Sequence, residues 1–158
     1  MDALLAHLHR SYGSCTNLLT YRALPSEVDT EPLLHLPDYH MFAPVTHDHS
    51  HMEWRLITPQ TRWSKGVFGV LEPKAGSVWP ANASTILLCP LTAFDRCGNR
   101  LGMGKGCFDY WLSSHQQHID CIIGLAFSGQ EVAHVPAEGH DVPMNYVITE
   151  KEVIACLN

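Results

Sequence analysis

Basic charge, long apolar runs and closely spaced cysteines are all scarce in this sequence. Its 10 Lys and Arg residues are outnumbered by 16 Asp and Glu residues, which gives a formal net charge of −6. Because binding to a nucleic-acid backbone requires a basic surface, we expect no nucleic-acid partner. No apolar run approaches the roughly 20 residues of a membrane-spanning helix, and residues 1–5 lack the basic start of a signal peptide. We therefore expect no membrane partner.

The six cysteines form no Cys-x-x-Cys pair, and a disulfide framework is not expected in a chain of 158 residues. This length allows the chain to bury a core without disulfides or metal. Hydrophobic residues make up 46% of the chain and charged residues 16%, which is a globular rather than a disordered composition. We predict a reduced, cytoplasmic and monomeric protein with a single domain over residues 1–158.

Two apolar runs, residues 85–89 and 121–125, contain almost no polar side chain. Such runs are typical of parallel strands that are buried on both faces. A further short strand is expected at residues 17–21. Residues 39–45 and 52–57 also have strand composition, and the polar run between them predicts a hairpin connection.

Helices are expected between these strands. One amphipathic helix ends near Leu8, and another covers residues 108–117. A third, short helix is predicted over residues 31–34, where Asp29 or Thr30 can cap its first turn. The alternation of strands and helices predicts an α/β fold, with a mostly parallel central sheet in a single three-layer domain and an antiparallel hairpin addition.

The most informative segment is residues 88–109, which combines a buried strand, a tight turn, a glycine-rich loop and a carboxylate. Gly102, Gly104 and Gly106 lie at alternate positions and are expected to let the backbone adopt conformations closed to residues with a Cβ atom, so that successive amides can converge on one anion. Arg100 and Lys105 add positive charge. A helix that begins near Gly106 would favour the same anion through its N-terminal amides.

The standard nucleotide motifs do not fit this loop. A Walker loop requires Ser or Thr after its Gly-Lys pair, but Lys105 is followed by Gly106. The dinucleotide motif requires two residues before its last glycine, and only Lys105 occupies that interval. On loop chemistry alone, a phosphate site and a plain glycine turn between strand and helix both remain open.

The whole segment resembles the 5-formyltetrahydrofolate cyclo-ligase family, also called methenyltetrahydrofolate synthetase. In that family a strand that ends in Pro leads through Ala-Phe-Asp-x-x-Gly-x-Arg-Leu-Gly-x-Gly-x-Gly to an aromatic-aromatic-Asp, and residues 90–109 match this pattern closely. Further segments agree in the same order, and the resemblance extends from about residue 17 onward. These segments are residues 21–30, 69–73, 123–127, 140–144 and 147–149.

The resemblance implies a reaction: ATP-dependent cyclisation of 5-formyltetrahydrofolate to 5,10-methenyltetrahydrofolate, with release of ADP and phosphate. ATP and Mg²⁺ are the implied cofactors, and a reduced folate is the implied partner. The nucleotide positions are Arg100, Leu101, Gly102, Met103, Gly104, Lys105, Gly106, Cys107 and Phe108. Arg100 and Lys105 are implied to hold the triphosphate in catalysis, because phosphoryl transfer requires positioning and charge neutralisation.

The same resemblance assigns positions to the folate and the metal. Glu27 is implied to contact the folate, and a carboxylate suits the N–H donors of a pterin-like ring. The other folate positions are Met103, Gly104, Lys105, Gly106 and Cys107. Asp109 and Asp141 are implied magnesium ligands, since a phosphate-bound Mg²⁺ usually takes only one or two protein carboxylates.

Two departures from the family pattern leave a second hypothesis open. The family usually has Tyr or Phe at the position of Cys107, so one aromatic wall of the folate pocket is expected to be missing. The family's first helix, which carries a Lys and an Arg that reach the ATP phosphates, has no counterpart before Met1. The roles of those cations are not transferred to His9 and Arg10. The alternative is a non-catalytic or weakened relative that binds folate or nucleotide.

Several other residues could bind a ligand or a metal, but we interpret them as structural. His47, His49 and His51 alternate and could bind a transition metal, but we interpret this run as a solvated hairpin turn, because metal sites usually draw ligands from separate elements. Trp63 and Phe68 could stack on an aromatic ligand, and we expect them in the apolar core instead. The pair Glu72-Pro73 is likewise expected to be structural.

Overall fold

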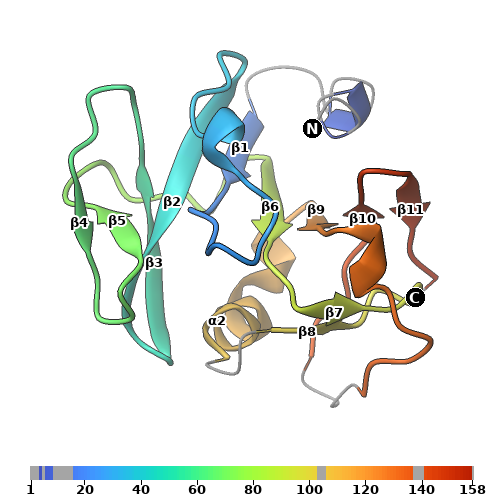
Figure 1. The fold of residues 1–158 in the computed structure, drawn as a ribbon. Helices are drawn as coiled ribbons and strands as arrows, with labels where there is room; N and C mark the ends of the chain where they lie inside the picture. The colour runs from blue at the N-terminus through green and yellow to red at the C-terminus, as the bar shows by residue number, and fades with distance from the viewer. Residues whose placement is uncertain (1–3, 5, 9–15, 103–105, 137–140, 158) are drawn as a thin grey trace.

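The computed structural model describes residues 4, 6–8, 16–102, 106–136 and 141–157. Its centre is a seven-stranded sheet with the strand order β11-β10-β9-β6-β1-β2-β3 (Figure 1). The strands are β1 (Thr16–Leu19), β2 (Tyr39–Asp48), β3 (His51–Leu56), β6 (Thr85–Cys89), β9 (Cys121–Leu125), β10 (Tyr146–Ile148) and β11 (Val153–Ala155). The inner pairs are parallel, and the outer pairs β2–β3 and β10–β11 are antiparallel. The predicted fold class, with its antiparallel hairpin addition, is confirmed.

Successive residues of the central strands face opposite sides of the sheet, as the period of a strand requires. In β6, Ile86 and Leu88 belong to one buried cluster, whereas Leu87 and Cys89 belong to the other. Every residue of β6 and β9 is buried. This double burial explains why both strands are nearly free of polar residues, and both lie at the predicted positions.

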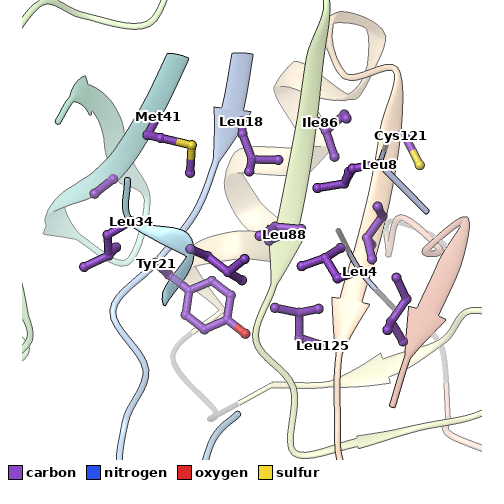
Figure 2. Close-up of a cluster of buried hydrophobic side chains, with 14 of the residues drawn as sticks. Leu4, Leu8, Leu18, Tyr21, Leu34, Met41, Ile86, Leu88, Cys121 and Leu125 are labelled. Atoms are coloured by element: carbon purple, nitrogen blue, oxygen red, sulfur yellow. The ribbon is translucent and has the colours of Figure 1, made fainter. Parts of the chain in front are cut away.

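Different elements cover the two faces of the sheet. Leu4 and Leu8, in a helical N-terminal stretch, pack with Leu18 and Ile86 on one face, as Figure 2 shows. The short 3₁₀ helix η1 (Glu31–Leu33) lies on the same side, through Leu33. The helix α2 (Cys107–His115) packs Trp111 and Leu112 on the opposite face. The sheet is therefore the middle of three layers.

Two small hairpins complete the part of the chain that bears on the site. One consists of β4 (Trp63–Lys65) and β5 (Leu71–Pro73), and it lies beside β2 and β3 (Figure 1). The other consists of β7 (Ala93–Phe94) and β8 (Arg100–Leu101) and leads into the glycine-rich loop. Neither hairpin was predicted as strands. The remaining 3₁₀ helices are η2 (Gln116–His118) and η3 (Ser128–Gln130).

Some predicted boundaries require correction. The strands β2 and β3 extend into the predicted polar connection and leave only a short turn around His49 and Ser50. The predicted helix over residues 31–34 is a single 3₁₀ turn. The Thr30 hydroxyl does not cap it, because that hydroxyl donates to the Tyr21 carbonyl, whereas the Asp29 carboxylate accepts from the Glu31 amide at 3.0 Å. The helix predicted over 108–117 ends at His115 and continues as η2.

Candidate active site

A cavity of about 300 Å³ opens at the carboxyl ends of β1 and β6. The chain leaves β1 toward β2 on one side and leaves β6 toward β9 on the other, so the strand order diverges at this point. Ligands of open α/β sheets bind at such a divergence, beyond the carboxyl ends of the strands. The volume lies at the small end of the range for ligand pockets, roughly 300 to 1,000 Å³.

Arg100, at the start of β8, is the buried cation of the cavity wall. Its side chain is only 4% exposed, and its guanidinium donates to Asp109 Oδ1 at 2.8 Å. A second, longer bond of 3.4 Å reaches the Pro90 carbonyl. The Nε atom is buried and has no hydrogen-bond partner among the described residues. Because a buried donor without a partner is costly, this atom marks a place for a ligand acceptor.

Gly106 begins α2 with φ +70°, in the left-handed region that favours glycine. No side chain of the described residues caps this helix start, and Gly106, Cys107, Phe108 and Asp109 all line the cavity. The first amides and the dipole of a helix attract an anion at this position. Together with Arg100, the start of α2 makes this wall suitable for a phosphate group.

Glu27 supplies the cavity with an acidic group, in contrast to the cation Arg100. It lies after β1 on the cavity wall, and its Oε1 accepts a hydrogen bond from the Leu24 amide at 2.7 Å. Burial raises the pKa of Glu27, and the bond from Leu24 opposes the shift only in part. A half-buried carboxylate of this kind is well suited to accept hydrogen bonds from the N–H groups of a ligand.

Tyr21 also reaches the cavity and was missed by the sequence interpretation. The residue is 3% exposed, and its hydroxyl has no partner among the residues that the structure describes. Burial, followed by the charges of Glu27 and Cys89, raises the pKa of Tyr21, while Arg100 lowers it. The hydroxyl therefore stays protonated and can donate. Its position directly beyond a buried strand end is the sequence signal that could have identified it.

The structure brings together most of the predicted site residues that it describes. Those on the cavity wall are Glu27, Arg100, Gly102, Gly106, Cys107, Phe108 and Asp109. Leu101 does not line the cavity, because its side chain points outward and is 53% exposed. Asp141 is half-buried and is not on this wall. Met103, Gly104 and Lys105 lie outside the described residues.

The expectation that all three alternating glycines adopt conformations closed to other residues requires correction at Gly102. Its φ is not in the left-handed region, and a Cβ atom there would meet Arg100 Nη1 at 3.5 Å, an ordinary contact. Gly102 directly follows β8 in the chain. Gly106 satisfies the expectation, and Gly104 lies outside the described residues.

Several of the side chains considered as metal ligands already have protein partners. Asp109 is ion-paired with Arg100, so its carboxylate already has a cationic partner. Within the described ranges, no group of three or more His, Cys, Asp and Glu side chains has the arrangement of a metal site. His51 Nδ1 lies 2.9 Å from Asp48 Oδ1, and His47 Nε2 lies 3.5 Å from Glu53 Oε1. The histidine run therefore lies at the β2–β3 turn, as interpreted.

The β4–β5 hairpin forms another wall of the cavity. Glu72 Oε2 accepts from the Thr46 amide at 2.7 Å and joins this hairpin to β2, which supports its structural role. Phe68 was expected in the core but is half-buried on the cavity wall, because it lies in the loop that projects from the hairpin. Trp63 packs partly against the core, and the Arg22 guanidinium lies 4.6 Å from its ring centre.

Among the described residues, no helix is both long enough and apolar enough to cross a membrane.

Residues 3–150 match the model of the 5-formyltetrahydrofolate cyclo-ligase family. Curated relatives share this name: the protein of Haemophilus influenzae is 34% identical over 135 residues, covering 81% of this chain and 72% of the relative. The protein of Escherichia coli is 31% identical over 140 residues, covering 84% and 77%.

Solved structures agree with the sequence relatives. The 5,10-methenyltetrahydrofolate synthetase of Aquifex aeolicus superposes with a TM-score of 0.76 at 25% identity, covering 99% of this chain and 81% of that one. The resemblance seen in residues 90–109 thus extends over nearly the whole molecule and is confirmed. The chain belongs to the 5-formyltetrahydrofolate cyclo-ligase family.

Proposed function

We propose that this protein catalyses the ATP- and Mg²⁺-dependent cyclisation of 5-formyltetrahydrofolate to 5,10-methenyltetrahydrofolate, with release of ADP and phosphate. One observation carries the proposal: a single cavity has a cationic wall at Arg100 and the start of α2, and a carboxylate with a protonated hydroxyl at Glu27 and Tyr21. The first wall suits phosphate oxygens, and the second suits the donors and acceptors of a pterin ring.

The formyl amide of the substrate is a weak electrophile with a poor leaving oxygen. ATP supplies a phosphoryl group that turns this oxygen into a leaving group, after which the neighbouring amine attacks the formyl carbon. The chain has to position the two substrates and balance charge, and it needs no protein nucleophile. Arg100 and the α2 amides hold the phosphates, and Lys105 is proposed to assist them.

Arg100 and Asp109 act as a unit in this proposal. The bond to Asp109 holds the guanidinium in place, while Nε remains available for a ligand. Because the Asp109 carboxylate is already paired, we propose that Mg²⁺ is held mainly by phosphate oxygens and water, with Asp109 and Asp141 as its protein contacts. Glu27 and Tyr21 orient the pterin ring by accepting and donating hydrogen bonds, respectively.

The test is direct, because the methenyl product contains a conjugated amidinium with its own near-ultraviolet absorbance. We expect this absorbance to grow when the purified chain is mixed with 5-formyltetrahydrofolate and MgATP, and not when ATP is omitted. Calorimetry measures the binding of each substrate separately. If both substrates bind and no ATP-dependent absorbance develops, the enzyme proposal is wrong and the non-catalytic alternative stands.

A further inference from the structure

The β7–β8 turn lies against the end of the edge strand β11 (Figure 1). Each of these segments carries a cysteine, Cys97 in the turn and Cys156 directly after β11. Three backbone hydrogen bonds connect these two segments with each other and with the chain just before β10. The Leu157 amide donates to the Arg96 carbonyl at 2.9 Å, the Met144 amide donates to the Gly98 carbonyl at 2.8 Å, and the Cys156 amide donates to the Asn145 carbonyl at 3.0 Å. Cys97 lies between the first two of these bonds.

The direction of these bonds places Cys97 at the end of β11. The Cys156 amide points toward the β10 side, so the next amide, that of Leu157, points away from it. Arg96 is therefore held on the outer side of β11, while Gly98 is held on the β10 side. The chain from Arg96 to Gly98 therefore spans the end of β11, and Cys97 is its middle residue.

The side chain of Cys156 faces the same side of the sheet as Phe94, which lies three residues before Cys97. It packs against the buried cluster that contains Phe94 of β7 and Trp111 of α2. Cys121 belongs to the cluster on the opposite face and is buried, so the sheet separates it from an exposed partner. Cys97 is exposed and Cys156 is half-buried. Burial, followed by the charges of Asp95, Cys97 and Cys121, raises the pKa of Cys156 to about 11.

We propose that Cys97 and Cys156 are a modification site at which a small disulfide, such as glutathione disulfide, forms a reversible intramolecular disulfide bond. The exposed Cys97 thiolate attacks one sulfur of the small disulfide and releases one small thiolate. Cys156 then loses its proton to solvent and attacks the Cys97 sulfur, which releases the second small thiolate. Two protein thiols are oxidised, and one small disulfide is reduced to two thiols.

The bond would fasten the end of β11 to the turn that leads into β8. Asp95 already organises this turn, since its carboxylate accepts from the amides of Cys97, Asn99 and Val135. A crosslink between positions 97 and 156 closes a long stretch of chain, which restricts the unfolded state more than the folded one. We expect the oxidised protein to melt roughly 5 to 15 °C higher than the reduced protein.

The sequence makes the bond easy to identify. Trypsin releases Cys97 in the peptide of residues 97–100 and Cys156 in the peptide of residues 152–158, and neither peptide contains another cysteine. The full chain is incubated with glutathione disulfide, alkylated and digested without reduction. We expect these two peptides to be linked, and to separate after treatment with dithiothreitol. The rise in Tm should accompany the linkage.

Variants separate this pair from other thiols. Cys97→Ser and Cys156→Ser should each abolish the linked peptides and the rise in Tm, whereas Cys121→Ser should retain the linked peptides. The proposal is overturned if glutathione remains on Cys97 while Cys156 stays free. It is also overturned if the linkage joins two chains, which non-reducing electrophoresis detects as a dimer. Because Cys97 is exposed, Cys97→Ser is expected to fold, and circular dichroism checks this.

Discussion

Two neighbouring regions of this molecule use buried polar groups in opposite ways. At the β7–β8 turn, the buried Asp95 carboxylate accepts hydrogen bonds from the amides of Cys97, Asn99 and Val135 and from the Asn99 side chain. In the cavity, the Tyr21 hydroxyl and Arg100 Nε are buried with no partner within the described part of the chain. Satisfied polar groups stabilise a fold, whereas unsatisfied ones that face a cavity are typical of a site that a ligand completes.

The comparison predicts that changes in the cavity will reduce activity and that changes in the turn will reduce stability. The largest expected effect is that of Arg100→Ala on turnover. Removing one preorganised cationic donor from a phosphoryl-transfer site typically lowers kcat by about 100- to 1,000-fold. The product absorbance measures this loss, and circular dichroism checks that the variant remains folded.

Arg96→Ala is the matched control for Arg100→Ala. Arg96 lies four residues earlier, and its half-exposed side chain bonds to Glu131 and Glu152 rather than to the cavity. We expect kcat to stay within about twofold of the wild-type value, since exposed ion pairs contribute little. Equal losses in both variants would show that Arg100 has no special role.

The next effect is on stability. Asp95→Ala leaves buried amide donors without an acceptor, and each such group costs about 1–3 kcal/mol. We expect a loss of roughly 2–4 kcal/mol in the free energy of unfolding, with kcat per folded molecule unchanged. Denaturant titration followed by circular dichroism measures the loss. Asp48→Asn is the control. The Asp48 carboxylate also accepts several hydrogen bonds, but its side chain is exposed. The free energy of unfolding of the Asp48→Asn protein should therefore hardly change.

Asp95 also gives a pH dependence with a definite sign. Burial raises its pKa, but the hydrogen bonds from Val135, Asn99 and Cys97 outweigh burial and lower the pKa overall. The folded-state pKa is therefore below the unfolded-state value. The associated stability is fully present above the unfolded-state pKa and is lost as the pH falls through the folded-state pKa. An Asp95→Ala protein whose stability fell as steeply in acid as the wild type would contradict this assignment.

Glu27→Gln is a further test of the difference between the cavity and the turn, because folate affinity and stability should change in opposite directions. We expect folate affinity to fall by about 10- to 100-fold at neutral pH, since a bond to a charged acceptor is replaced by a weaker one. Burial raises the pKa of Glu27, so the charged form is costly in the folded protein and the Gln variant should melt at a higher temperature. Calorimetry and thermal unfolding measure the two effects.

The pH profile of Glu27 provides a separate check. In the wild type, folate affinity should fall as the pH is lowered through the raised pKa of Glu27, because the protonated carboxyl loses its charge. In Glu27→Gln the affinity should be nearly flat over the same range. Identical profiles in the two proteins would remove Glu27 from pterin recognition.

The sequence predicted the features that depend on local pattern. The fully apolar runs identified β6 and β9, and residues to which the resemblance assigned roles, among them Glu27, Arg100 and Gly106, line one cavity in the structure. Features that depend on tertiary contacts were missed. The position of Tyr21 in the cavity follows from the packing of η1 and β6 around the end of β1. The projecting β4–β5 loop carries Phe68 to the cavity, although an aromatic residue on its own predicts a core position.

The smallest predicted effect is the most specific test of the cavity. Tyr21→Phe removes only the hydroxyl oxygen, and that oxygen bonds to no described residue, so no hydrogen bond within the described part of the chain is lost. The free energy of unfolding should therefore stay the same or rise slightly. If the hydroxyl donates to the pterin ring, the KM for 5-formyltetrahydrofolate should rise about 5- to 10-fold, with the KM for ATP unchanged.

Tyr39→Phe is the matched control, because the Tyr39 hydroxyl is also buried without a described partner but lies outside the cavity wall. Equal KM values in wild type and Tyr21→Phe would show that a buried, unpartnered hydroxyl is tolerated in this protein without a ligand to satisfy it.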